Sequence, residues 1–240
     1  KTLNDCRFVL EMTQTRPAGW LLAILLVVPP VFTAMAIGDD HPGYRAVTGP
    51  CDFGFPRDHG AHPGFRTEWW SYTGNLRAAN GARFGFQLTF FRHQLRPAAD
   101  RHQWPQPASA WRTDQIFLAH AALTDIDAGR HYQAEDIGRG VLDLAGVELR
   151  AHDARVFLGE WEAVVGSQGH ALAMTDAEFG FDLKLVPVKD LVAHGDRGYS
   201  RKGTDPARAS CWMELSRMAL KRLISKSCRH ITGRKEMATH

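Results

Sequence analysis

Apolar and polar residues alternate along the chain from Glu68 to Pro187. Every second residue is apolar from Phe84 to Phe90, and the same alternation recurs from Phe179 to Leu185. Successive side chains of a strand point to opposite faces, so this pattern is typical of half-buried strands. No comparable run of helical period occurs before residue 210. The pattern therefore predicts an all-β fold.

Turn signals separate the expected strands at short intervals. After the first hairpin, we expect strands over Gln115 to Thr124, Arg155 to Val165, His170 to Thr175 and Phe179 to Pro187, with a proline-rich loop from Arg96 to Ala110. Many short antiparallel strands with such spacing predict a barrel or a sandwich, and the pattern alone does not separate the two.

The first hairpin can be placed in register from its apolar residues. A two-residue turn at Asn80-Gly81 would mix the two faces, because it pairs Thr73 with Leu88. A three-residue loop over 79–81 instead sets Trp70 against Phe90 and Glu68 against Arg92. This loop needs a left-handed residue at its third position, where Gly81 stands without steric cost. We predict the three-residue loop.

The N-terminus has the three-part pattern of a secretory signal peptide. Arg16 precedes an apolar run from Gly19 to Phe32, and Ala34-Met35-Ala36 follows as a cleavage signal. The alternative is an uncleaved anchor, since this run approaches the length needed to span a bilayer. We expect cleavage near Ala36, Met12 as the translation start, and a secreted or periplasmic protein.

Composition adds little to this picture. The formal charge of +3 over 240 residues shows no nucleic-acid footprint before the last thirty residues, so no nucleic-acid partner is expected. The four cysteines lack metal-site spacing, and one disulfide is possible without being indicated. Nucleophile elbow, H-E-x-x-H, Walker and dinucleotide motifs are absent from the sequence.

Titratable and aromatic residues are concentrated from Phe55 to Trp70, within a stretch rich in proline and glycine. Asp58, His59 and His62 are the candidate catalytic residues, because imidazoles and tuned carboxyls transfer protons near neutral pH. His59, His62 and Glu68 could also be metal ligands, but their spacing is loose and no metal is predicted. The structural alternative is a set of ion pairs that fixes the loop.

Other side chains are candidates for ligand binding, although each also has a structural explanation. Aromatic residues at strand spacing can stack on a long apolar ligand or can belong to an ordinary core. We expect His120, within an apolar run, to be a hydrogen-bonded histidine of the core or lumen. The candidate ligand-binding residues are Arg57, Glu68, Trp69, Trp70, Tyr72, His120, His194, Asp196 and Arg197.

Three segments together carry a family resemblance. They are F-P-R-D-H-G-A-H-P-G-F-R-T-E-W-W at Phe55 to Trp70, W-R-T-D-Q-I-F-L-A-H-A-A-L-T-D at Trp111 to Asp125, and H-G-D-R-G-Y-S-R-K-G at His194 to Gly203. The chain resembles the secreted, lipocalin-like proteins grouped with hydroxyneurosporene synthase (carotenoid 1,2-hydratase) and the AttH-type predicted secreted hydrolases. The resemblance covers roughly Phe53 to Ser210.

The resemblance implies two lipocalin-like barrels in tandem, of which this chain has residues for one. It favours a barrel for residues 37–210 and implies a missing second domain, whose W-M-D-x-E-W stretch holds the best candidate acids. We therefore expect a truncated protein that binds an apolar, isoprenoid or lipid-like molecule without a cofactor. The alternative is a hydratase that adds water to a terminal C=C bond of an acyclic carotenoid, or a related secreted hydrolase.

The last segment, 211–240, departs from the family pattern. It is basic and shows no strand alternation, so we expect a non-β tail that arose by truncation or a frame change. The alternative is a basic amphipathic helix with Leu215, Met218 and Leu223 on one face. Membrane association is possible through this tail or through the signal segment.

Overall fold

The structure is a computed structural model that describes residues 9–11, 43–78, 80–201, 209–211, 213–214 and 218–223. The regular secondary structure of the described residues is almost entirely antiparallel strand, which confirms the predicted all-β class. Two 3₁₀ helices, η1 (Arg57–His59) and η2 (Ala98–Gln103), precede β2 and follow β3. The expected loop from Arg96 to Ala110 thus contains one short helix.

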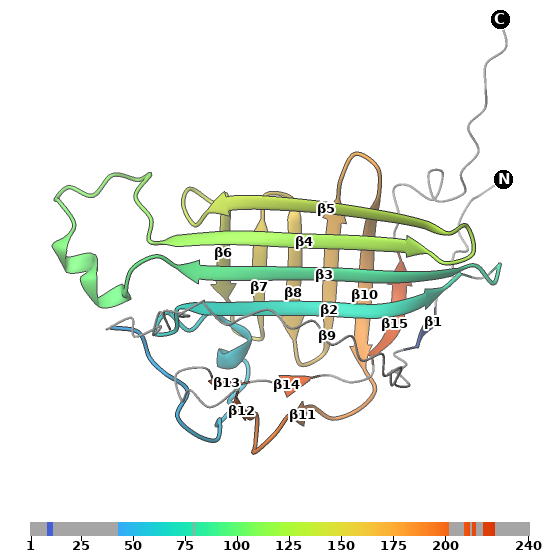
Figure 1. Ribbon diagram of the computed structural model, residues 1–240, viewed down its shortest axis with the longest axis horizontal. Helices are drawn as coiled ribbons and strands as arrows, with labels where there is room; N and C mark the ends of the chain where they lie inside the picture. The colour runs from blue at the N-terminus through green and yellow to red at the C-terminus, as the bar shows by residue number, and fades with distance from the viewer. Residues whose placement is uncertain are drawn as a thin grey trace, which may run out of the picture.

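Two sheets form the body of the molecule (Figure 1). The five-stranded sheet runs in the order β1 (Val9–Glu11), β2 (Thr67–Arg77), β3 (Arg83–Gln94), β4 (Gln115–Asp125) and β5 (Arg130–Arg139). The six-stranded sheet runs in the order β15 (Met218–Leu223), β10 (Gly180–Pro187), β9 (Gly169–Thr175), β8 (Trp161–Gly166), β7 (Asp153–Leu158) and β6 (Ala145–Leu149).

The two sheets pack face to face, and the strands of one run across those of the other (Figure 1). The sequence left a barrel and a sandwich open. The described strands form two packed sheets, each with its own ladder of hydrogen bonds. Two short ribbons lie beside the second sheet. They pair β11 (Val192–Ala193) with β14 (Met213–Glu214), and β12 (Tyr199–Arg201) with β13 (Ala209–Cys211).

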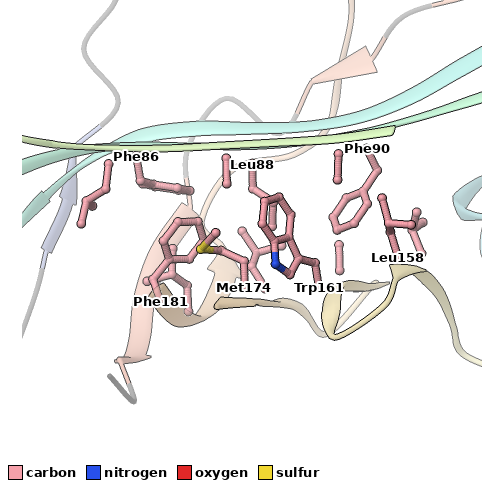
Figure 2. Packing of buried hydrophobic residues seen from close by; sticks show 14 of the residues in the cluster. Phe86, Leu88, Phe90, Leu158, Trp161, Met174 and Phe181 are labelled. Carbon is pink, nitrogen blue, oxygen red and sulfur yellow. The ribbon is translucent and has the colours of Figure 1, made fainter. Parts of the chain in front are cut away.

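The core lies between the sheets, as Figure 2 shows. Alternate residues of β3, among them Leu88 and Phe90, are fully buried and face Trp161 and Met174 from the second sheet. Each such side chain stabilises the fold by roughly 1.5–3 kcal/mol when it leaves water. The alternation that predicted the strands therefore also identifies the buried face.

The first hairpin has the predicted register. Trp70 pairs with Phe90 and Glu68 with Arg92, and the Ala78 amide donates to the Ala82 carbonyl at 2.8 Å to close the loop. Gly81 has a φ of +87°, as the three-residue loop requires. Apolar pairing across the strands therefore sets this hairpin, and the two-residue turn is not used.

The prediction of a non-β tail is wrong for the residues of 211–240 that the structure describes. β13, β14 and β15 all come from the C-terminal part of the chain, and β15 pairs antiparallel with β10 along five residue pairs. Met218 is buried against the core, so the strand shields apolar surface as well as completing the edge of the sheet. The alternative of a helix through Met218 and Leu223 is wrong for the same reason.

The two ends of the folded region are tied by a disulfide between Cys51 and Cys211, whose Cα atoms lie 5.9 Å apart. The sequence had left this pairing open. The predicted signal segment, residues 12–36, lies outside the described residues. β1 precedes the predicted start at Met12 and pairs with the far end of β2. Within the described ranges, no helix has the length and apolar character to cross a membrane.

Candidate functional site

The loop before β2 folds around the carboxylate of Asp58, in η1. This carboxylate accepts hydrogen bonds from the Gly54 amide at 2.6 Å and from the Arg57 guanidinium at 2.8 Å, and it contacts His62 Nε2 at 3.0 Å. Pro56 and Gly60 flank the helix and end it at a single turn. Three predicted site residues, Arg57, Asp58 and His62, are thus brought together.

His62 lies between two carboxylates. Its Nδ1 atom is 2.6 Å from Glu68 Oε1, opposite the contact with Asp58, and its backbone amide also donates to Glu68 at 2.9 Å. Glu68 stands near the start of β2, so this bond attaches the loop to the sheet. The imidazole is about one-third exposed and both carboxylates are largely buried.

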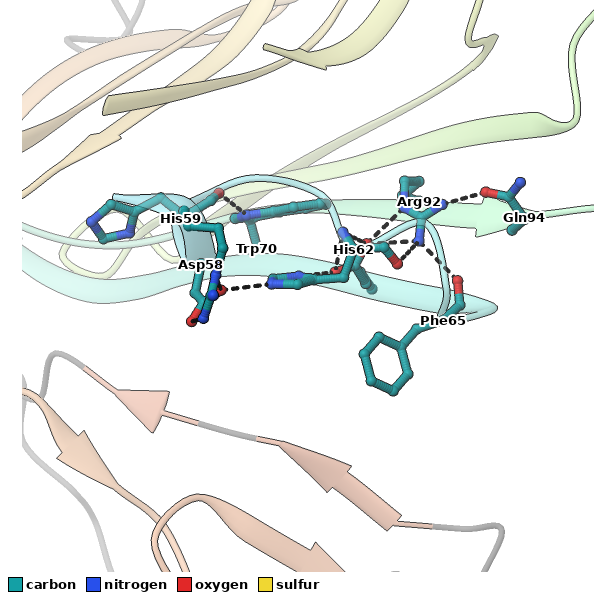
Figure 3. A network of polar contacts seen from close by, with 9 residues as sticks. Asp58, His59, His62, Phe65, Trp70, Arg92 and Gln94 are labelled. Atoms are coloured by element: carbon teal, nitrogen blue, oxygen red, sulfur yellow. Dashed lines mark hydrogen bonds and ion pairs between the residues drawn. The ribbon is translucent and has the colours of Figure 1, made fainter. Parts of the chain in front are cut away.

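Arg92 holds the other side of Glu68 (Figure 3). Its Nε donates to Glu68 Oε2 at 2.8 Å, its Nη2 donates to the carbonyls of His62 and Phe65, and its Nη1 donates to Gln94 at 2.6 Å. Arg92 is fully buried. A buried guanidinium is tolerated where hydrogen bonds and a counter-charge satisfy it, so this residue fastens the loop to β3.

The proton affinities in this network favour fixed charges. Burial opposes ionisation of Asp58, but the bonds from Arg57, Gly54 and His62 outweigh it and hold the pKa well below its ordinary value. Burial likewise opposes ionisation of Glu68, and the bond from His62 with the charge of Arg92 lowers its pKa. The bond to Glu68 raises the pKa of His62 despite burial. The carboxylates of Asp58 and Glu68 thus hold the His62 ring from both sides, and Arg92 holds Glu68. These four residues form a clamp that fixes the loop to the sheet.

His59 belongs to a second cluster, at the point where the loop meets both sheets. Its ring lies 4.3 Å from the ring of Phe55 and 6.2 Å from that of His170, measured between centroids. His170 is buried in β9, and its Nδ1 atom is 3.1 Å from the Tyr72 hydroxyl in β2. One predicted catalytic residue and one predicted ligand-binding residue therefore meet around a histidine that was not predicted.

This second cluster is uncharged near neutral pH. Burial lowers the pKa of His170 to about 4, with a further contribution from His59. Burial also lowers the pKa of His59, against the charge of Asp58, and it raises the pKa of the Tyr72 hydroxyl. The three buried polar groups therefore carry no charge where the loop meets the sheets.

The neighbouring tryptophans of β2 point to opposite faces. Trp70 packs against the core and its Nε1 donates to the His59 carbonyl at 3.1 Å, so it supports η1. Trp69 is 45% exposed on the outer face. Trp70 and Tyr72 share the inner face, as the aromatic alternation predicts, while Trp69 faces away from the cluster.

The placement of His120 in the core or lumen is wrong. In β4 the buried positions are Phe117, Ala119, Ala121 and Leu123, and His120 lies on the other face with its side chain 43% exposed. It contacts Phe91 and lies 4.0 Å from Glu135. Apolar residues occupy both faces of this strand, so the sequence did not indicate which face is inside.

His194, Asp196 and Arg197 lie in a tight turn before β12. Asp196 and Tyr199 exchange backbone hydrogen bonds, and Arg197 has a left-handed backbone with φ +48°. The Asp196 and Arg197 side chains are mostly exposed, whereas the Arg197 carbonyl accepts from the Cys51 amide at 3.1 Å. Through this bond the backbone of the turn supports the base of the loop.

Sequence reasoning missed His170, Gln94 and Asp114. Gln94 and Asp114 are buried and extend the network from Arg92, since the Gln94 amide donates to Asp114 at 2.9 Å. Each is a polar residue that stands at a buried position in a strand or directly beside one. A polar residue that interrupts the apolar face of an alternating strand is a signal by which each could have been found. Arg92 was placed opposite Glu68 but was not included among the site residues.

Among the described residues, no group of three or more His, Cys, Asp and Glu side chains is arranged to hold a metal ion. His59 and His62 make separate sets of contacts, with Phe55 and His170 in one case and with Asp58 and Glu68 in the other. The alternative in which His59, His62 and Glu68 share a metal is therefore not supported by the geometry.

Comparisons with known proteins agree with the fold. The AttH-like family model matches residues 46–234, which include most of the C-terminal segment. The crystal structure of a candidate AttH protein from Nitrosomonas europaea is similar, with 33% sequence identity and a TM-score of 0.57. The match covers 70% of this chain and 48% of that one, so the present chain spans about half of the length of that protein. No curated protein matches. On these grounds, the chain belongs to the AttH-like family.

Proposed function

We propose that this protein binds an uncharged apolar molecule, of isoprenoid or lipid-like type, at the cluster formed by Phe55, His59 and His170. The proposal rests on one observation: uncharged polar side chains lie beside exposed apolar side chains at the same end of the molecule. His59, His170 and Tyr72 are uncharged near neutral pH because burial disfavours their charged forms. Such groups fix the orientation of a ligand that has few polar atoms of its own.

Apolar side chains stand beside this cluster. Phe55 is 40% exposed and packs on the His59 ring. Leu149 is 54% exposed at the end of β6, and its side chain lies beside Gly60, directly after His59. An apolar ligand that covers these side chains removes them from water, which stabilises the complex by the hydrophobic effect.

The ligand is proposed to lie at this loop end, because the space between the sheets is occupied. Phe86, Leu88 and Phe90 meet Trp161, Met174 and Phe181 across that space (Figure 2). Interiors packed in this way leave few voids larger than a water molecule. The aromatic residues of the strands therefore serve mainly as core, and the loop residues serve as the binding surface.

The alternative function is hydration of a terminal C=C bond of an acyclic carotenoid, or a related hydrolysis. Protonation of an unactivated alkene needs a strong acid held in its neutral form. The lowered pKa values of Asp58 and Glu68 do not favour that form. If the family performs this reaction, we expect its acid to come from the half of the longer protein that this chain does not match.

We further propose that the protein is secreted or periplasmic, with the signal segment removed near Ala36. The Cys51–Cys211 disulfide supports this, since disulfides persist in oxidising compartments. The intact mass of protein expressed from Met12 in a Gram-negative host tests it. Retention of residues 12–36 in the purified protein would favour the anchor instead.

Binding is tested with N-phenyl-1-naphthylamine, a neutral apolar dye that fluoresces when it leaves water, and with farnesol as the competitor. Saturable fluorescence that farnesol displaces is expected. Phe55→Ser should weaken dye binding by about tenfold, the effect of losing one apolar anchor of about 1.5 kcal/mol. The control is Leu142→Ser, at a leucine that is 50% exposed in the connection between β5 and β6. Equal binding by both variants would contradict the proposed site.

A further inference from the structure

An open cleft of about 340 Å³ lies at the ends of β3 and β4, apart from the clusters around His62 and His170. Its walls include Leu95, Arg96, Trp104, Pro105, Arg112 and Asp114. All of its lining residues lie in the segment between the two strands, which contains η2. Figure 1 shows the course of this segment. None of these residues takes part in the proposed function.

The cleft carries positive charge. Arg112 extends over the indole ring of Trp104, with its guanidinium carbon 5.6 Å from the ring centroid. Arg96 and Arg112 are both exposed, and neither forms an ion pair with a carboxylate in the part of the chain that the structure describes. Two guanidinium groups on one cleft favour an anionic ligand, because their planar donors match a carboxylate.

The acidic residue of the cleft does not cancel this charge. Asp114 accepts two hydrogen bonds from Arg101, at 2.7 and 2.9 Å, and one from Gln94 at 2.9 Å. Its side chain is almost completely buried. The carboxylate is therefore neutralised by its own partners, and Arg96 and Arg112 remain available to a ligand.

The cleft is also held in shape before any ligand binds. The Leu95 amide donates to the Asp114 carbonyl at 2.6 Å, and the Thr113 hydroxyl donates to the Gly140 carbonyl at 3.1 Å. Gln94, directly before Leu95, is held by Arg92. A preorganised wall lowers the entropic cost of binding.

We propose that this cleft binds a small carboxylate with a compact apolar body, such as a medium-chain fatty acid. The carboxylate pairs with Arg96 and Arg112, and the apolar body lies against Leu95, Trp104 and Pro105. The volume of the cleft is near the lower end of the range for small-molecule sites. It fits a ligand of this size and is too small for a long polyene. The site is thus separate from the one proposed above.

Isothermal titration of the whole protein with octanoate tests the proposal. Saturable binding is expected with a Kd of about 1 mM or lower. Octan-1-ol has the same chain without the charge, and acetate has the charge without the chain. As competitors that displace octanoate from the cleft, both should be at least about tenfold weaker than octanoate itself, because each lacks one of the two sets of contacts.

Variants locate the site. Arg112→Gln and Arg96→Gln should each weaken octanoate binding by about tenfold, the loss of one charge-assisted bond. Arg130→Gln is the matched control, since this exposed arginine begins β5 beside the opposite end of β4. No saturable binding, equal displacement by octan-1-ol or acetate, or unaltered binding by both cleft variants would overturn the proposal.

Discussion

The Tyr72 hydroxyl and the His170 Nδ1 atom, 3.1 Å apart, join the two sheets through one hydrogen bond. Tyr72 belongs to β2 and His170 to β9, and 98 residues separate them in sequence. The bond places a neutral imidazole at the edge of the core. It therefore makes the packing of the sheets sensitive to protonation of this histidine.

Stability should fall as the pH decreases from 6.5 to about 4. The folded-state pKa of His170 lies below its ordinary value of 6.5, so in this window the unfolded chain takes up a proton that the folded chain does not. The contribution is on the order of 3 kcal/mol when the shift is complete. Urea unfolding across this range should show a shallower decrease for His170→Asn than for the wild type.

His152→Asn is the control for that measurement, because His152 is exposed in the turn before β7. His62 acts in a different window, since its raised folded-state pKa contributes stability that is lost as the pH rises above 6.5. An unchanged slope between pH 6.5 and about 4 in His170→Asn would show that this histidine is not held neutral.

Replacement of Arg92 should be far more destabilising than its position on a strand suggests. Arg92→Met leaves Glu68 buried without its counter-charge, at an expected cost of about 3–5 kcal/mol in the free energy of unfolding. Arg83→Met, in the same strand, breaks an exposed ion pair with Asp127 and should cost below about 1 kcal/mol. Similar costs for both variants, measured by urea unfolding, would contradict the clamp.

Gly81→Val should destabilise the first hairpin by about 1–2 kcal/mol, the usual cost of holding a β-branched residue left-handed. Gly81 has φ +87° and open space where a Cβ would stand, so the cost is conformational. Gly49 also has open space but has no positive φ, and Gly49→Val should be close to neutral. Thermal unfolding of both variants separates backbone strain from side-chain size.

Met218→Ala should cost about 2–5 kcal/mol, as expected for a buried methionine in a packed core. Met213, in the short ribbon of β14, is only partly buried, and its replacement by alanine should cost much less. Denaturant unfolding of the two variants is the measurement. A negligible effect at Met218 would indicate that the C-terminal strand does not contribute to the core.

No hydration of neurosporene is expected from this chain alone. Asp58 and Glu68 are held ionised, and His59 favours its neutral form, so none of them is a ready acid for an alkene. Product analysis by chromatography with the wild type and His59→Ala provides the test. Hydrated product from the wild type that disappears in the variant would place the acid in this loop.

Local alternation accounts for the part of the fold that the sequence predicted. The hairpin register follows from pairing Trp70 with Phe90, because a slip of one residue exchanges the faces. From that register the pairing of Glu68 with Arg92 also follows. The contact between Glu68 and Arg92 could therefore be predicted from the sequence, because the hairpin register places the two residues opposite each other.

Long-range contacts account for what the sequence did not predict. His170 meets Tyr72 only because the sheets pack, and Cys51 meets Cys211 across 160 residues of chain. Met218 lies in a strand without alternation, whose place depends on the free edge of β10. The face of His120 was ambiguous because both sides of β4 are apolar. In each case tertiary packing decides what local pattern leaves open.

The Cys51–Cys211 bond also makes a covalent ring of the chain between them. That ring contains η1, every strand from β2 to β13, and the segment between β3 and β4 that lines the cleft. A single proteolytic cut after Arg101, in that exposed segment, would open the ring without dividing the molecule. The cut chain would migrate as two fragments only after reduction, because the disulfide keeps β2 and β3 covalently joined to the strands that follow the cut.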